Sequence, residues 1–216
     1  MAQVRLEGFH AVKHALRFAP ELVHEVEAAD LDALAALAAR LAPDLVDVLA
    51  ARAVRAPVEH HTGVQARADV PVQDRSCLLA RATPLVLLDA PRSPGNAGAV
   101  VRVAAAAGAS GVAVCGGTVD PWGPAALRGS AGLHYALPVL SVELSEVAGP
   151  VVVLDAGGDP AAPVPADGVL VVGSERTGVG EALRARADAV LALPMRAGVS
   201  SLNLATAVAA ALYRGR

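Results

Sequence analysis

The chain has 216 residues, enough for one large domain or for a small domain joined to a medium one. Its apolar runs are interrupted by Arg, Asp, Gly or Pro well short of the ~18 residues that a membrane span requires, which excludes a membrane-spanning helix and predicts a soluble protein. The net charge of −3 gives no sign of nucleic-acid binding through bulk positive charge, yet a local arginine face is compatible with it.

The first ten residues carry charges where a signal peptide would have its apolar segment, so we expect a cytoplasmic protein. Cys77 and Cys115 stand alone, without a CxxC pair, which favours reduced thiols over a disulfide or a metal site. His10 and His14 have the i, i+4 spacing of a metal pair, but the glutamate of an HExxH motif is absent, which favours the alternative of an exposed helix face. We expect no metal site.

Residues 1–70 predict a small α/β unit. Residues 8–18 and 31–41 have the apolar spacing of amphipathic helices, the second behind Asp30 as an N-cap. Residues 22–29 and 59–70 have the alternation of short strands.

From Pro71 the chain alternates short apolar runs with helix-like segments. The runs are "PLVLLDA", "GVAVCG", "ALPVLSV", "VVVLDAG", "GVLVVGSE" and "AVLALPM". Strands that are apolar on both faces and alternate with helices predict a mostly parallel sheet covered on both sides. Ligands of such sheets bind beyond the carboxyl ends of the strands, so the polar residues after each run are the candidates for a functional site.

The run "PLVLLDA" is followed by "SPGNAGAVVRVAAAAGA", which predicts a helix over residues 97–107 with Asn96 as its N-cap. Arg102 lies within this alanine and valine helix, which we expect to be buried. A buried arginine needs a partner. Asn96 and Arg102 are not on one helix face, so they converge only if Arg102 reaches back to the helix entrance.

Residues 171–180, "VVGSERTGVG", match neither nucleotide loop: the Lys and Ser or Thr of a P-loop are missing, and so is the GxGxxG spacing. A plain glycine turn remains an alternative. In the C-terminal segment, Ser200 or Ser201 is expected to cap a final helix whose apolar face uses Leu204, Val208 and Leu212, with Asn203 in its first turn.

In order and spacing, these three segments resemble the three motifs of the SpoU, or TrmH-like, branch of the SPOUT RNA methyltransferases. The first motif has an Asn and an Arg six apart, here Asn96 and Arg102, and the second has a glycine-bounded Glu, here Glu175. The third is a Pro-Met strand end followed by Ser-Leu-Asn, here with Ser201 and Asn203. The resemblance covers residues 75–216. The ends of residues 1–70 also resemble the small L30e-like RNA-binding domain found in several members.

The resemblance implies an α/β SPOUT fold at residues 71–216, with a C-terminal deep trefoil knot that is an exception to the general absence of knots. It implies that S-adenosylmethionine is bound in this knot. The implied cofactor-binding residues come from the second and third motifs: Gly173, Ser174, Leu193, Met195, Ser201 and Leu202.

The implied reaction is methyl transfer to a ribose 2′-hydroxyl by a homodimer. Asn96, Arg102, Glu175, Ser201 and Asn203 form the implied catalytic set, with Arg102 at the ribose and Glu175 paired with it. Arg102 and Arg128 are the implied RNA-binding residues, Arg128 acting from the partner subunit.

We expect ribosomal RNA as the substrate, with tRNA as the alternative because "ERTG" and "SLNLA" also resemble tRNA-modifying members. A non-catalytic RNA-binding or ribosome-assembly factor on the same fold is the alternative from another class, and the intact motif residues argue against it. A nicotinamide-dependent oxidoreductase is disfavoured by the missing glycine fingerprint.

Overall fold

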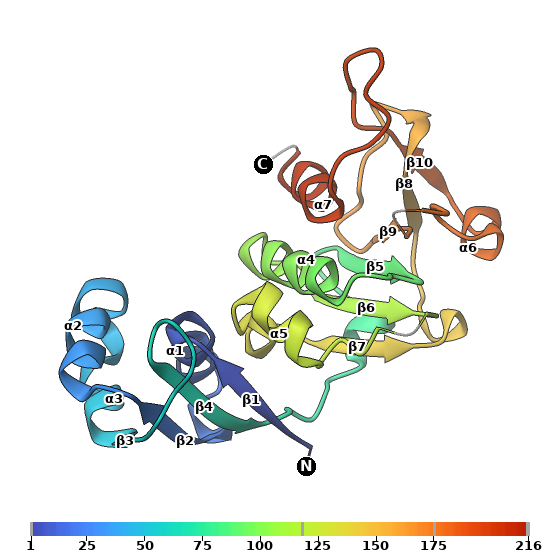
Figure 1. Cartoon of the computed structure of the whole chain (residues 1–216). Helices are drawn as coiled ribbons and strands as arrows, with labels where there is room; N and C mark the ends of the chain where they lie inside the picture. The colour runs from blue at the N-terminus through green and yellow to red at the C-terminus, as the bar shows by residue number, and fades with distance from the viewer. Residues whose placement is uncertain (1, 118, 175, 215–216) are drawn as a thin grey trace.

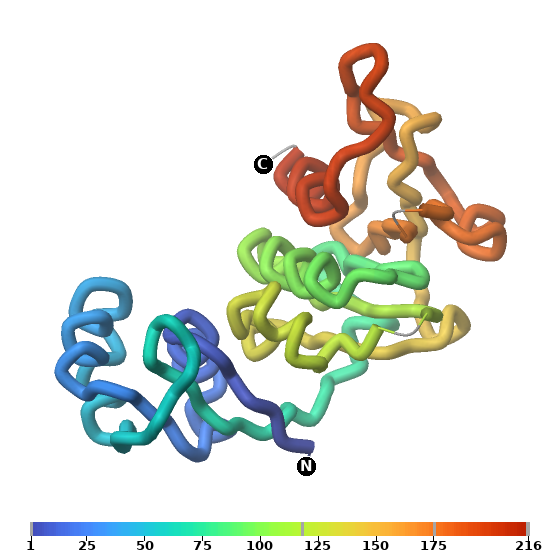
Figure 2. The backbone as a smooth tube through the Cα atoms, viewed as in Figure 1, coloured from blue at the N-terminus to red at the C-terminus, as the bar shows by residue number. Residues whose placement is uncertain are grey.

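The structure, a computed structural model, describes residues 2–117, 119–174 and 176–214 and contains two β-sheets (Figure 1). The first sheet has the order β1-β4-β2-β3, and β4 lies antiparallel to both of its neighbours, whereas β2 and β3 are parallel. Its strands are β1 (Gln3–Glu7), β2 (Val23–Ala28), β3 (Ala53–Arg55) and β4 (Val64–Asp69). The chain passes to the second sheet through the segment that follows β4 (Figure 2).

Three helices accompany the first sheet: α1 (Phe9–Phe18), α2 (Leu31–Leu41) and α3 (Val46–Arg52). The two helices and two strands predicted in this part are confirmed. The Asp30 carboxylate caps α2 by accepting hydrogen bonds from the backbone N–H groups of Asp32 and Ala33, at 2.8 and 2.9 Å. The pattern did not predict β1, β3 and α3, which are short or carry charges between their apolar residues.

The second sheet has six strands in the order β10-β8-β9-β5-β6-β7, and every neighbouring pair is parallel. Each of the six apolar runs forms one strand, so the predicted parallel sheet is confirmed. The strands are β5 (Leu85–Asp89), β6 (Gly111–Cys115), β7 (Val139–Val142), β8 (Val151–Asp159), β9 (Val169–Val172) and β10 (Ala189–Leu191). The central strands are buried on both faces because helices cover both.

One face of the second sheet packs on α4 (Pro94–Ala106) and α7 (Leu204–Tyr213), which lie next to each other (Figure 1). The opposite face packs on the 3₁₀ turn Ser76–Leu78 and on α6 (Glu181–Ala185). The predicted apolar face of α7 is confirmed, since Leu204, Val208 and Leu212 are all buried. No helix among the described residues is long and apolar enough to cross a membrane.

Helix α5 (Pro124–Ser130) crosses α4 at backbone contact, which only glycine permits. A Cβ on Gly98 would lie 2.0 Å from the carbonyl oxygen of Ala126, and one on Gly129 would lie 2.5 Å from that of Gly95. The close crossing fixes α5 against α4, and the 3₁₀ turn Leu133–Tyr135 follows directly after α5.

The N-terminal part is fastened to α5 and to the residues after it. The Nδ1–H of His14 donates to the carbonyl of Ala131 at 2.7 Å, and the Tyr135 hydroxyl donates to the carbonyl of Asp69 at 3.2 Å. Leu127 and Tyr135 are buried in the same apolar core as the N-terminal helices and strands. The two sheets are therefore joined by packing as well as by the connecting segment.

A buried histidine lies at this junction. The Nε2–H of His134 donates to the carbonyl of Pro121 at 2.7 Å, so Nδ1 accepts from the Ser130 hydroxyl, which lies 2.6 Å away. Trp122 packs edge-on against the ring. His134 is only 1% exposed, and this burial lowers its pKa to about 4.

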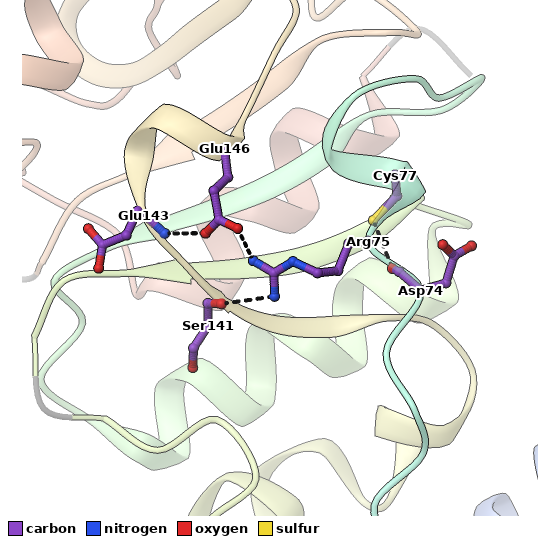
Figure 3. A network of polar contacts seen from close by, with 6 residues as sticks. All are labelled: Asp74, Arg75, Cys77, Ser141, Glu143 and Glu146. Atoms are coloured by element: carbon purple, nitrogen blue, oxygen red, sulfur yellow. Dashed lines mark hydrogen bonds and ion pairs between the residues drawn. The ribbon is translucent and has the colours of Figure 1, made fainter.

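A polar network fastens the segment before β5 to the edge strand β7 (Figure 3). The Arg75 guanidinium forms an ion pair with Glu146 and donates to the carbonyl of Ser141 at 3.5 Å. The other carboxylate oxygen of Glu146 accepts from the backbone N–H of Glu143 at 2.7 Å, and Cys77 is buried beside this segment as a free thiol. These exposed contacts hold the connecting segment at the sheet edge.

The buried neutral His134 makes folding stability depend on pH. Because its pKa of about 4 lies below the ordinary value of 6.5, the unfolded chain binds the proton more tightly. The contribution of the neutral His134 to the free energy of unfolding should therefore be fully present above about pH 6.5. The free energy of unfolding should fall by up to about 3 kcal/mol as the pH approaches 4. Urea unfolding across this range measures the loss.

His134→Gln should make the free energy of unfolding less dependent on pH between about 4 and 6.5. His61→Gln, at an exposed position, is the control and should leave the pH dependence unchanged. An unaltered pH dependence in His134→Gln would contradict its assignment to the buried histidine.

Candidate functional site

The loop that follows β9 turns back on itself immediately after the strand. A Cβ on Gly173 would lie 2.0 Å from the carbonyl carbon of Gly178, so the backbone passes where any side chain would stand. Ser174 and Gly178 exchange two backbone hydrogen bonds, of 3.1 and 2.9 Å, and Gly178 has a positive φ of 68°. The glycines of this segment are thus required by the close return of the chain.

Side chains fix the loop at its middle and at its end. The hydroxyls of Ser174 and Thr177 lie 2.7 Å apart, and Ser174 is buried. The Asp89 carboxylate, at the carboxyl end of β5, accepts from the backbone N–H of Gly180 at 2.6 Å. The loop is therefore closed by its own hydroxyls and anchored at its end to the neighbouring strand β5.

A cavity of about 300 Å³ lies at the carboxyl end of β9, beside the middle of β8. It is bounded by these two strands, the loop after β9, the segment after β10 and the first turn of α7. Its lining residues are Leu154, Asp155, Ala156, Val172, Gly173, Ser174, Gly178, Leu193, Met195, Ser200, Ser201, Leu202, Leu204 and Ala207. The lining combines apolar side chains with backbone groups and hydroxyls, the composition of a small-molecule site.

The structure brings together around this cavity all six residues for which cofactor binding is predicted. They are Gly173, Ser174, Leu193, Met195, Ser201 and Leu202. They come from two segments that are about twenty residues apart in the sequence. Their role toward a ligand stays a prediction.

The final helix is capped by a different residue from the one expected. The Asn203 side-chain oxygen accepts from the backbone N–H groups of Ala205 and Thr206, at 3.0 and 3.4 Å, so Asn203 is the N-cap and the expected cap at Ser200 or Ser201 is wrong. The two serines are exposed and line the cavity. Asn203 is the cap because it directly precedes the first residue of α7, Leu204, and its short side chain reaches the free N–H groups of the first turn.

The helix after β5 also begins earlier than predicted. Ser93 is its N-cap, accepting from the backbone N–H of Asn96 at 3.2 Å, and Pro94 is its first residue. Asn96 therefore lies in the first turn and not at the cap. The signal for this boundary was Pro94, because proline is favoured at the first helical position.

Arg102 is exposed on α4, so the expectation of a buried arginine is wrong. The side of α4 that carries Arg102 is left uncovered, while Val101 and Ala104 are buried. Among the described residues, neither Asn96 nor Arg102 lines the cavity. Glu175 lies outside the described residues, so its expected pairing with Arg102 stays a prediction.

Arg128 lies on α5, where its guanidinium forms an ion pair with Glu7 of β1 at 2.8 Å. The Arg128 side chain is 52% exposed and remains accessible to a further ligand. The sequence did not reveal this ion pair, since the two residues are 121 positions apart.

The sequence reasoning missed Asp155 and Arg184. Asp155 lines the cavity from β8, and its carboxylate accepts from Arg184 of α6 at 2.5 Å. The backbone N–H of Gly157 and the guanidinium of Arg184 lower the pKa of Asp155, so the cavity holds an ionised carboxylate at neutral pH. Asp155 directly follows the apolar residues 151–154 of β8, and polar residues at this position after a strand are candidates for a functional site.

A parallel sheet covered by helices, with a cavity of this kind beyond the carboxyl ends of its strands, defines a ligand-binding α/β protein. The chain belongs to the SpoU rRNA methylase family, whose model matches residues 83–213.

Two relatives extend this result. The chain is 34% identical over 190 residues to the 23S rRNA (uridine(2479)-2′-O)-methyltransferase of Streptomyces viridochromogenes, a match that covers 80% of this chain and 64% of that enzyme. It is 31% identical over 229 residues to the 23S rRNA (guanosine(2553)-2′-O)-methyltransferase RlmP of Bacillus subtilis, covering 98% and 87%. The chain thus spans just under two thirds of the Streptomyces enzyme and most of the Bacillus one.

Solved structures agree with this fold. The SpoU methyltransferase AviRb of Streptomyces viridochromogenes, in complex with the cofactor AdoMet, has a TM-score of 0.79 at 25% identity and covers 98% of this chain and 88% of its own. A structure described as concerning 2-OH methylation of C/U34 on tRNA has a TM-score of 0.55 at 27% identity and covers 61% of this chain. The implied α/β fold with a helix-flanked parallel sheet is confirmed.

The capping role of Asn203 can be separated from any role at the cavity. Asn203→Ala should lower the free energy of unfolding by about 1 kcal/mol, because two N–H groups of α7 lose their acceptor. Asn203→Asp should restore most of that loss. Chemical denaturation of both variants provides the measurement, with Ser200→Ala as the matched control for the expected but incorrect cap. A larger loss in Ser200→Ala than in Asn203→Ala would contradict the assignment.

Proposed function

We propose that this protein is an S-adenosylmethionine-dependent methyltransferase that modifies a ribose 2′-hydroxyl of 23S ribosomal RNA. The observation that carries the proposal is the convergence of the second and third motif segments on one cavity. The relatives named above support the reaction and the RNA, and the AdoMet complex of AviRb supports the cofactor.

The cavity suits the cofactor by its composition. Leu193, Met195 and Leu202 offer an apolar surface to an adenine ring, and the glycine at position 173 gives close access to the backbone. The ionised Asp155 and the hydroxyl of Ser201 provide polar groups for the remainder. When bound, S-adenosylmethionine supplies a methyl group already activated by a sulfonium.

The chain's own residues must align the ribose hydroxyl with that methyl group and assist loss of its proton. We assign Arg102 to positioning the ribose or its phosphate and to stabilising charge, because a guanidinium that titrates above about 12 is a poor base. Asn96 would orient Arg102 or the ribose, and Glu175 would pair with the arginine. Ser201 and Asn203 would fix the C-terminal loop near the reacting nucleotide.

A homodimer accounts for the separation of these groups. Arg102 is exposed on α4 and does not line the cavity of its own chain among the described residues. In a dimer whose RNA site combines residues of both subunits, Arg102 and Arg128 of one subunit would serve the cofactor of the other. We also propose that the C-terminal segment forms the trefoil knot that the family resemblance implies.

We propose residues 1–70 as a small L30e-like RNA-binding domain and residues 71–216 as the methyltransferase domain. The two separate sheets and the single crossing between them support this division. We propose a cytoplasmic location, which fits an rRNA substrate.

A second candidate substrate is tRNA. The structure concerning C/U34 of tRNA is similar over 61% of this chain. That similarity leaves more than a third of the chain uncovered, whereas AviRb and RlmP match nearly the whole chain, which favours ribosomal RNA.

The proposal predicts label transfer from methyl-labelled S-adenosylmethionine to unmodified 23S rRNA, recovered as alkali-resistant 2′-O-methyl nucleotides. Arg102→Ala should reduce the rate at least about a hundredfold through lost positioning and charge stabilisation, with S-adenosylhomocysteine affinity unchanged. Arg75→Ala is the matched control, because this exposed arginine pairs with Glu146 at the sheet edge and does not line the cavity.

Three results would count against parts of the proposal. Label found only in tRNA would replace the substrate. Full activity of Arg102→Ala would remove the assigned role of this arginine. If the protein binds the cofactor but methylates neither 23S rRNA nor tRNA nor any other RNA offered, the non-catalytic RNA-binding alternative would be favoured.

A further inference from the structure

Asp155 is the one charged side chain among the described residues that line the cavity. One carboxylate oxygen accepts from the backbone N–H of Gly157 at 3.0 Å, and the other accepts from Arg184 at 2.5 Å. The side chain is 31% exposed, so these two contacts do not enclose it. A carboxylate has about four acceptor positions, so capacity remains for a donor entering the cavity.

The Arg184 guanidinium makes two contacts at once, one with each of two cavity-forming segments. Its Nε–H donates to the carbonyl of Val179 at 2.9 Å, while Nη2 donates to Asp155. Val179 belongs to the loop after β9, and Asp155 belongs to β8. The rigid guanidinium fork therefore fixes one cavity wall relative to the other.

An ionised carboxylate in a cavity wall needs a cationic partner in the protein. Its free acceptor positions can then accept hydrogen bonds from donor groups of a ligand. S-Adenosylmethionine carries three such donor groups: the amino group of its adenine, the hydroxyls of its ribose and the ammonium of its amino-acid end. The remaining polar groups of the lining are hydroxyls and backbone atoms, which carry no charge.

We infer that Asp155 is a cofactor-binding residue that accepts a hydrogen bond from S-adenosylmethionine. Arg184 is then a positioning residue that fixes Asp155 relative to the loop after β9. The inference rests on the proposed function and deepens it. It assigns a role to two residues that lie outside the three motifs.

Isothermal titration with S-adenosylhomocysteine tests the assignment without any methyl transfer. Asp155→Ala should weaken binding about tenfold or more, because a charge-assisted hydrogen bond is lost. Asp155→Asn keeps the shape of the side chain and should weaken binding several-fold. Arg184→Gln should also weaken binding, with partial recovery in Arg184→Lys, which keeps the charge without the fork.

Arg186→Gln is the matched control. Arg186 lies at the end of the same short helix and donates to the carbonyls of Leu144 and Val147, both at 2.8 Å, away from the cavity. It should alter thermal stability to a similar extent as Arg184→Gln and leave the affinity unchanged. An equal loss of affinity in Arg186→Gln would overturn the positioning role of Arg184.

Titration with 5′-methylthioadenosine, which lacks the amino-acid end, identifies the donor. An equal loss for both ligands in Asp155→Ala supports a hydrogen bond from the nucleoside, and a loss confined to S-adenosylhomocysteine supports one from the ammonium. Wild-type affinity in folded Asp155→Ala and Asp155→Asn would overturn the inference alone. Failure of the wild-type protein to bind S-adenosylhomocysteine would overturn the proposed function as well.

Discussion

The candidate site depends on the contact between Gly173 and the backbone of Gly178 and Val179. The chain leaves β9, turns, and returns to within van der Waals distance of its own first residue, so no side chain fits at position 173. This return places backbone groups of the loop, instead of side chains, at the cavity wall. Asp89 on one side and Arg184 on the other then fix the loop to β5 and β8, so that a cavity persists where the strands end.

A second constraint concerns the use of arginine. Several arginines donate to backbone carbonyls within the fold: Arg81 to Cys77, Leu78 and Gly168, Arg52 to Pro20, and Arg186 to Leu144 and Val147. Others, such as Arg17 and Arg128, are paired with carboxylates. Many of the cations of this acidic chain therefore serve the fold, and RNA recognition would have to depend on shape and a few placed residues more than on bulk charge.

The sequence predicted what depends on local periodicity and order. All six strands of the second sheet and the amphipathic helices are read from apolar spacing. The second and third motif segments identified residues that converge on the cavity, whereas Asn96 and Arg102 of the first motif do not line it. The errors concern choices between neighbouring residues at helix starts. Ser93 is the cap of α4 where Asn96 was expected, and Asn203 is the cap of α7 where Ser200 or Ser201 was expected. The exposure of Arg102 and the Asp155–Arg184 and Glu7–Arg128 pairs depend on how distant segments pack, which periodicity along one segment does not encode.

The cavity formed by this backbone return is the site that we propose for the cofactor. A crystal structure of the protein with S-adenosylhomocysteine tests it most directly. We expect ligand density against Gly173, Met195 and Leu202, with the hydrogen bonds between Ser174 and Gly178 intact. Ligand bound elsewhere on the chain, or in this cavity only after the loop has opened, would contradict it.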